Sequence, residues 1–162
     1  MTFTILHTES STGWGGQENR TLHECVGLRK KGARVIILCQ PESKLNKRAL
    51  AEGIDVRTCR MKKSYDILAI NYILKLIKNE DIDIINTHSG RDSLLAGIAG
   101  RLSRRKPVIV RTRHLALPIT SKFTYSLLAH KIVTVSEYVK RYLAENGIAP
   151  EKITAIPTGI NT

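Results

Sequence analysis

Three of the five histidines stand at or near the ends of apolar runs that are typical of buried strands. His7 follows TFTIL, His88 follows DIINT, and His114 follows PVIVRTR, which also carries Arg111 and Arg113. Parallel strands end at one edge of a sheet, and neighbours lie about 5 Å apart. We therefore predict that the three histidines span about 10 Å of one crevice, with the two arginines beside them. Imidazole can donate, accept or carry a proton near neutral pH, and guanidinium can hold an anion.

Other reaction types find little support in the sequence. His23 and His130 fall within or beside helical segments and are interpreted as structural. The three histidines at strand ends come from separate elements without a carboxylate at short spacing, so we predict no metal site. Ser89 precedes Gly90 without the G-x-S-x-G pattern, which excludes the usual hydrolase nucleophile.

A glycine-rich loop, HTESSTGWGGQENR, separates the first apolar run from the first amphipathic segment. Glu18 stands where a G-x-G-x-x-G motif starting at Gly13 would need glycine, and no P-loop motif is present. Gly15 and Gly16 nevertheless bring bare backbone N–H groups to a helix N-terminus, where anions are favoured. Alternatively, the glycines only form the turn.

The elements that position these residues alternate along the whole chain. The pattern predicts strands at 2–6, 34–39, 54–59, 82–86, 107–113, 131–135 and 152–156, and helices at 16–31, 43–53, 65–79, 91–104, 120–129 and 137–145. Small residues within 91–104 should let that helix lie close to a sheet, and Ser136 should cap the last helix. This alternation predicts an α/β fold with one doubly wound parallel sheet. With 162 residues, we expect a single domain.

Composition limits location and partners. Net charge is +12, which favours a polyanionic partner such as nucleic acid, an anionic membrane or a phosphorylated substrate. The N-terminus lacks the features of a signal peptide, and no apolar run approaches the roughly 18 residues that cross a bilayer. Three cysteines without C-x-x-C spacing favour free thiols in a reducing cytoplasm.

Five stretches together resemble the N-terminal domain of a GT-B glycosyltransferase of family 4, over nearly the whole chain. GGQE (15–18) resembles the family's G-G-x-E loop, DIINTH (83–88) its D-x-[IV]-[HN]-x-H strand, and VRTRH (110–114) a strand ending in [TR]-x-H. VTVS (133–136) before a helix and IPTGIN (156–161) resemble the exit V-x-[VP]-N-G-[IV]-D, with Thr158 where the family often has Asn.

The resemblance implies a Rossmann-like, three-layer α/β/α fold that is one half of a GT-B enzyme, with residues 1–162 as the acceptor-side domain. In the family, the exit segment leads to a second domain that binds the nucleotide-sugar donor. We expect that C-terminal domain to be absent from this chain, which alone should bind no cofactor and be inactive. The full-length enzyme would be a retaining glycosyltransferase of the hexosyltransferase type. Its acceptor would be a glycan or lipid-linked molecule in cell-envelope polysaccharide or lipopolysaccharide synthesis.

Site residues follow from the same resemblance. Gly15 and Gly16 match the loop near the donor diphosphate, and His114 matches the histidine that hydrogen-bonds the transferred sugar, so His114 is the expected catalytic residue. Expected acceptor contacts are Trp14, as a platform for sugar or lipid, and His88, Arg91 and Arg113.

A basic stretch, RMKKSY (60–65), precedes the amphipathic segment 65–79. Many relatives act at the cytoplasmic membrane face, so we hypothesise that Arg60, Lys62 and Lys63 contact an anionic membrane or lipid phosphate. Each basic residue near such a surface contributes about 1 kcal/mol. The protein would then be cytoplasmic and peripheral on the inner membrane face. A solvated loop is the alternative.

Two rival functions remain open at this point. A UDP-sugar 2-epimerase would share the GT-B architecture and the need for a second domain. A basic nucleic-acid-binding Rossmann-like module would account for the charge. Few aromatic residues, 5%, are available to stack bases, and no RNA- or DNA-binding motif is apparent. We therefore expect no nucleic-acid partner.

Overall fold

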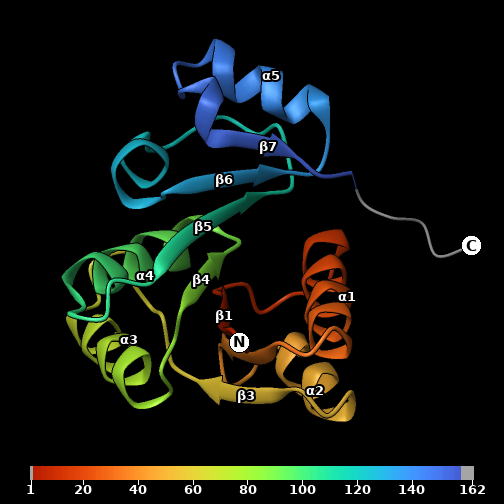
Figure 1. Cartoon of the computed structure of the whole chain (residues 1–162), viewed down its shortest axis with the longest axis vertical. Coiled ribbons are helices and arrows are strands. Elements are labelled where there is room, and N and C mark those ends of the chain that lie inside the picture. The colour runs from red at the N-terminus through yellow and green to blue at the C-terminus, as the bar shows by residue number, and fades with distance from the viewer. Residues whose placement is uncertain (1, 158–162) are drawn as a thin grey trace, which may run out of the picture.

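A seven-stranded parallel sheet runs through the molecule in the order β3-β2-β1-β4-β5-β6-β7 (Figure 1). The computed structural model describes residues 2–157. Its strands are β1 (Thr4–Glu9), β2 (Arg34–Cys39), β3 (Asp55–Thr58), β4 (Ile84–Thr87), β5 (Val108–Arg113), β6 (Lys131–Thr134) and β7 (Ile153–Ala155). The predicted parallel sheet is confirmed, and the change of direction in strand order falls between β1 and β4.

Helices cover both faces of this sheet. They are α1 (Gly16–Lys30), α2 (Lys44–Ala51), α3 (Ile67–Asn79), α4 (Gly90–Leu102) and α5 (Glu137–Glu145), with a short 3₁₀ turn at Pro150–Lys152. Figure 1 shows α1 and α2 on one side of the sheet and α3 and α4 on the other. The fold is therefore the predicted doubly wound, Rossmann-like α/β arrangement. The predicted exit motif runs into residues 158–162, which lie outside the described residues.

Side chains that alternate along the strands pack into two apolar cores, one on each face of the sheet. Leu6 and Ile36 pack with α3 and α4, whereas Ile37 and Cys39 pack with α1 and α2. A smaller cluster, which includes Ile132 and Leu143, lies beneath α5. Continuous apolar runs such as RVIILC are thus explained by burial on both faces.

Local predictions are mostly confirmed, with two exceptions. Ser136 caps α5, since its Oγ accepts a hydrogen bond from the Val139 N–H at 3.2 Å. Strand β1 extends through Glu9, so His7 lies inside the strand rather than after it. The predicted helix at 120–129 was wrong in extent and type, because only Thr124–Leu128 is helical and it forms a π-turn.

Candidate functional site

Three histidines form one hydrogen-bonded line across three neighbouring strands. Nδ1 of His7 lies 3.0 Å from Nε2 of His88, and Nδ1 of His88 lies 3.1 Å from Nε2 of His114. Adjacent ring centroids are 5.3 and 5.4 Å apart. The predicted convergence is confirmed, because β1, β4 and β5 are adjacent in the sheet. We call these residues the histidine line.

Burial keeps the histidine line neutral. It lowers the pKa of His7 to about 4 and that of His114 to about 4, with the charge of Arg20 adding to the effect at His114. Burial, followed by the influence of the two flanking imidazoles, lowers the pKa of His88 well below its usual value. At neutral pH each ring therefore carries one N–H and one bare nitrogen.

Neutral rings in line can be ordered in only two ways, with all N–H groups on Nδ1 or all on Nε2. Nε2 of His7 is buried and has no partner among the described residues. With N–H on Nε2, His7 would have a buried N–H without a hydrogen-bond acceptor. With N–H on Nδ1, the same Nε2 would be only an acceptor without a donor. A buried N–H without a partner is the rarer of the two in folded proteins. The line therefore favours Nδ1–H on all three rings, and His114 offers Nδ1–H as a donor.

The two arginines of β5 do not join the histidine line. Successive strand residues point to opposite faces, so Thr112 and His114 share one face while Arg111 and Arg113 share the other. Thr112 Oγ1 donates to Asn86 Oδ1 at 2.8 Å, on the face of His114. Arg111 and Arg113 instead lie 3.9 and 6.0 Å from the ring centroid of Tyr125. The predicted placement of both arginines beside the histidines was wrong as to the face of the sheet, because strand alternation turns their side chains the other way, although the charge of Arg113 still acts on His114.

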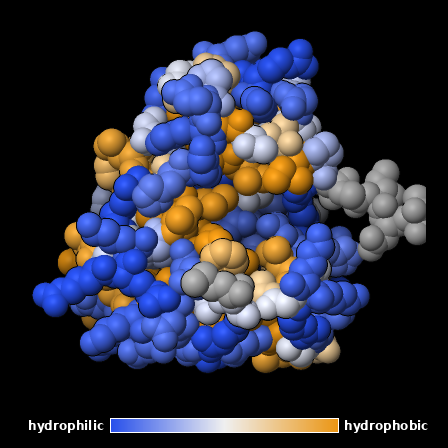
Figure 2. All heavy atoms as spheres, in the orientation of Figure 1, coloured by the Kyte–Doolittle hydropathy of each residue, from blue (hydrophilic) through white to orange (hydrophobic). Residues whose placement is uncertain are grey.

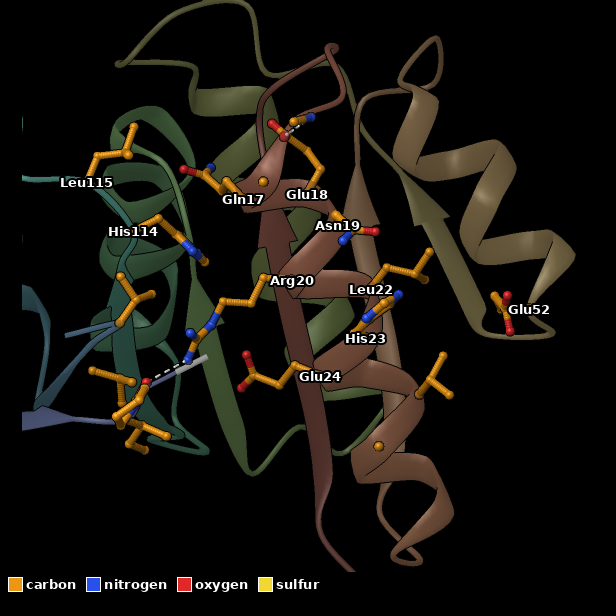
Figure 3. A pocket seen from close by; sticks show the side chains of 18 of the residues that line it. Gln17, Glu18, Asn19, Arg20, Leu22, His23, Glu24, Glu52, His114 and Leu115 are labelled. Carbon is orange, nitrogen blue, oxygen red and sulfur yellow. Dashed lines mark hydrogen bonds between the residues drawn. The ribbon is translucent and has the colours of Figure 1, made fainter. Parts of the chain in front are cut away.

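A groove of about 1280 Å³ borders the exposed end of the histidine line. It is lined by His114 and Leu115 after β5, by residues in and after β6, by the segment after β7, and by α1 along its length from Gly15 to Lys30. Arg20 and Glu24 point from α1 toward the side that carries His114, while Glu52 lies on the other side of this helix (Figure 3). The groove thus brings His114 and the glycine loop to one site.

The glycine loop is only partly available to an anion. The Gly15 N–H donates to Glu18 Oε2 at 2.8 Å, so it is not bare as predicted, because the buried Glu18 carboxylate already caps this helix end. A side chain at Gly16 would meet no atom within 4 Å, which shows that Gly16 faces open space. Gly16 is therefore the better placed of the two predicted phosphate contacts.

Trp14 is held against the protein rather than standing over the crevice. Its ring packs on the apolar core beneath α1 and α2, and the Arg48 guanidinium lies 4.2 Å from the ring centroid. It is not among the residues that line the groove. The structure therefore does not bring Trp14 to His114.

The three other expected acceptor contacts lie in three different environments. His88 is 4% exposed and both its ring nitrogens are engaged, so it cannot touch a ligand directly. Arg91 is exposed and donates to the Met61 carbonyl at 2.8 Å. Arg113 donates to the Leu117 carbonyl on the face away from the histidine line. Sequence spacing indicated the strand ends but not the face on which each side chain lies.

Several polar residues of the site were missed by sequence reasoning. Arg20 and Glu24 are four residues apart on α1, a spacing that places both on one helix face. Arg20 Nη2 donates to the Ile156 carbonyl at 3.0 Å across the groove. Burial raises the pKa of Glu24, whose Oε1 accepts from Asn86 Nδ2 at 3.3 Å. The four-residue spacing of Arg20 and Glu24 could have indicated from the sequence that both lie on one helix face.

A buried carboxylate lies under the glycine loop. Glu9 accepts from the Ser11 N–H at 3.0 Å and from Gln17 Nε2 at 2.6 Å. Burial, with the charge of Asp92, raises the pKa of Glu9 to about 7. The sequence offered no signal for this residue, because the first strand was predicted to end before it.

The basic stretch is exposed except at one anchor. Arg60, Lys62 and Lys63 are exposed, whereas Met61 is fully buried and its N–H donates to Gln40 Oε1 at 3.0 Å. Three large apolar side chains next to it are 71 to 83% exposed, namely Tyr65, Ile67 and Leu68. No helix within residues 2–157 is long and apolar enough to cross a membrane.

Metal coordination does not fit the histidine line, because its nitrogens bond to one another instead of converging on one point. Within the described part of the chain, no group of three His, Cys, Asp or Glu residues could hold a metal ion. The cysteines of this region are free: Cys25 and Cys39 are buried and Cys59 is half-buried. What the site offers is hydrogen bonding and positive charge.

Comparison with known proteins identifies the family. The sequence model of Glycosyltransferase Family 4 matches residues 14–162. The chain belongs to this family. A glycosyltransferase from Rickettsia africae is similar in structure, with a TM-score of 0.86 and 25% identity over 99% of this chain and 44% of that chain. No curated protein sequence matches the chain significantly.

More distant structures share the fold of this family 4 domain. HepE from Anabaena, solved with UDP-glucose, has a TM-score of 0.81 and 14% identity over 98% of this chain and 44% of that chain. A putative UDP-N-acetylglucosamine 2-epimerase from Listeria monocytogenes has a TM-score of 0.71 and 15% identity over 94% and 44%. The predicted N-terminal family 4 domain and GT-B half are confirmed, and the chain spans less than half the length of these relatives.

Proposed function

We propose that this domain binds the acceptor of a retaining glycosyltransferase and places it against a nucleotide-sugar held by a second domain. The observation that carries the proposal is the histidine line, which ends at His114 on the groove beside Gly16. Membership in Glycosyltransferase Family 4 supports the transfer chemistry. HepE, a structure with the same fold, was solved with UDP-glucose, which supports a UDP-sugar donor.

Each groove residue has a definable part in such a transfer. His114 offers a neutral Nδ1–H to an oxygen of the transferred sugar, and His7 and His88 fix the position of that proton. Gly16 allows a diphosphate to approach the N-terminus of α1, where the helix dipole favours negative charge. Arg20 adds a cation near His114. Donors and cations aimed at the departing diphosphate stabilise the transition state as negative charge develops on it.

The test of this proposal uses the full-length enzyme with a panel of UDP-sugars and cell-envelope acceptors. Removing one catalytic hydrogen-bond donor typically costs about 10²–10³ in turnover, and we expect His114→Ala to lose activity on that scale. His114→Asn, whose amide can replace Nδ1–H, should retain more. Wild-type turnover in a folded His114→Ala enzyme would contradict the site assignment.

A sugar 2-epimerase is the second function that an observation favours, because the Listeria epimerase shares this fold. The same assay separates the two. Transfer produces a glycosylated acceptor, whereas epimerisation produces a free or nucleotide-bound sugar with inverted C2 and needs no acceptor.

A further inference from the structure

A second cavity, of about 750 Å³, lies on the sheet face opposite the histidine line. It lies between the start of α4 and the segment that follows β5, and Arg111 reaches it from β5. Its lining combines cations, hydroxyls and apolar groups, including Arg91, Arg111, Ser121, Thr124, Leu94 and Phe123. None of the residues of the first groove lines it.

Arg111 is a buried cation with a free donor. The residue is 5% exposed, its Nη1 donates to Thr124 Oγ1, and its guanidinium lies over the Tyr125 ring. Its Nε is buried and has no partner among the described residues. Arginine stays protonated in proteins, so burial does not remove this charge.

No carboxylate of the described residues forms an ion pair with Arg111. Asp92 acts on it electrostatically, but the Asp92 oxygens already accept from Thr8 Oγ1 and from the N–H groups of His88 and Ser89. Buried charges in folded proteins are normally paired and hydrogen-bonded. An unpaired buried arginine at a cavity therefore indicates an anionic ligand.

Two further features suit an anion with several oxygens. Arg91 lines the same cavity and is exposed in the first turn of α4, a 13-residue helix whose N-terminus favours negative charge. The hydroxyl of Ser121 adds a donor, whereas that of Thr124 already donates to the Ser121 carbonyl at 3.3 Å. Two guanidinium groups match the charge and oxygen count of phosphate better than those of a single carboxylate.

We propose that this cavity binds a phosphate group of the acceptor, held by Arg111 and Arg91, with the adjoining part of the molecule against Leu94 and Phe123. The assignment of the ligand as acceptor rests on the proposed function. The phosphate site itself rests on Arg111 and the cavity. The phosphate can come from an apolar lipid phosphate or from a soluble sugar phosphate.

Calorimetric titration of this chain with three probes tests the proposal without any donor. The probes are inorganic phosphate, n-octyl phosphate and glucose 1-phosphate. We expect saturable binding, tightest for octyl phosphate if the source is a lipid and tightest for glucose 1-phosphate if it is a soluble sugar. Absence of saturable binding by all three would overturn the site.

Charge-matched variants locate the binding. Arg111→Gln and Arg91→Gln should each weaken binding by about tenfold or more, the loss of one charge-assisted hydrogen bond. Arg104→Gln removes the same charge from an exposed residue outside the cavity and should leave binding unchanged. Arg91 is exposed, so its variant tests the site even if Arg111→Gln fails to fold. Equal weakening in Arg104→Gln would mean unspecific attraction and would overturn the proposal.

The outcome is separable from that of the proposed function. Phosphate binding by this chain together with a full-length enzyme that transfers no sugar would refute the transferase and keep the site. Sugar transfer that is unaffected by Arg91→Gln, together with no phosphate binding by this chain, would refute the phosphate site and keep the transferase.

Discussion

At the scale of single residues, His7, His88 and His114 act as a unit because each contact between rings fixes the proton of the next ring. Only His114 reaches the groove, so the other two influence a ligand through it. His7 and His88 are therefore positioning residues.

The protonation of the histidine line can be observed directly. Long-range ¹H–¹⁵N correlation spectra at pH 7 should show Nδ1–H on His7, His88 and His114, because the opposite order leaves a buried N–H of His7 without a partner in the described part of the chain. The spectrum of His23, which is exposed and outside the line, gives a signal for comparison. An Nε2–H pattern for His114 would contradict the assignment.

The pH dependence of stability has two opposing contributions near this site. His7 and His114 have pKa values of about 4 in the fold and near 6.5 when unfolded, so their contribution is full above pH 6.5 and is lost as pH falls toward 4. Glu9, with its pKa raised to about 7, contributes stability below its unfolded pKa near 4.5 that is lost as pH rises through 7.

Glu9→Gln should therefore change the shape of the stability curve. At pH 8 the variant should be more stable than the wild type by about 1–3 kcal/mol, because it removes a carboxylate that is costly to ionise there. This advantage should vanish by pH 4.5, so that the variant loses stability more steeply on acidification. Urea unfolding at a series of pH values measures the free energy of unfolding of both proteins. A difference in that free energy that does not change with pH would refute the role of Glu9.

At the scale of elements, the alternation of side chains along β5 places its residues in two different sites, one on each face of the sheet. Thr112, which bonds to Asn86, and His114 lie on the face of the histidine line, while Arg111 and Arg113 lie on the opposite face with Tyr125. Helix α4 can lie close to β5 and to the π-turn because Gly97 and Gly100 carry no side chain. A Cβ at Gly97 would lie 2.9 Å from Leu128 Cδ1 and 3.0 Å from Leu128 Cβ.

Substitution of Gly97 tests this close packing. Gly97→Ala should destabilise the protein by about 1–3 kcal/mol, because the contact with Leu128 Cβ cannot be relieved by rotating a side chain. Gly27→Ala in α1 is the matched control, since a Cβ there meets no atom within 4 Å. The higher helix propensity of alanine should make this variant more stable than the wild type by about 0.5–1 kcal/mol. Unfolding in urea compares them, and an equal gain in both variants would refute the packing argument.

At the scale of the whole molecule, the net charge of +12 includes cations in different surroundings at the two edges of the sheet. At the edge where the strands begin, Arg34 and Arg57 are engaged in ion pairs with Asp55 and Glu80. At the other edge, Lys62 and Lys63 are exposed next to apolar side chains. In Figure 2, apolar surface reaches the middle of the view between hydrophilic regions, so exposed apolar groups are not confined to the neighbourhood of the basic stretch. The membrane hypothesis therefore rests on the exposed lysines beside the exposed side chains of Ile67 and Leu68.

Sedimentation with vesicles tests membrane contact. The chain should bind vesicles with anionic lipid, and binding should fall with rising salt because the attraction is electrostatic. Lys62→Gln/Lys63→Gln should weaken it by about 2 kcal/mol, at about 1 kcal/mol per residue. Lys30→Gln/Lys31→Gln, at the opposite edge of the sheet, should not. Equal binding to neutral and anionic vesicles would rule the hypothesis out.

The sequence predicted the fold well because its signals are local. Apolar runs such as 34–39 and the amphipathic segment 137–145 match β2 and α5 residue for residue. The segment 120–129 was mispredicted because its geometry depends on contacts with distant residues, as Arg111 and Arg113 lie over Tyr125. The convergence of three histidines could be predicted because strand order and strand ends are enough to place them.

The sequence by itself determined the alternation of strands and helices, the family, and the gathering of His7, His88 and His114 at one part of the sheet. Only the tertiary structure decided which face each side chain occupies, that the Gly15 N–H is taken by Glu18, and that Arg111 is buried with no carboxylate partner between residues 2 and 157. The physical reason is that periodicity and turn residues act within a few positions of the chain. Burial, hydrogen-bond pairing and charge compensation depend on neighbours that are far apart in sequence.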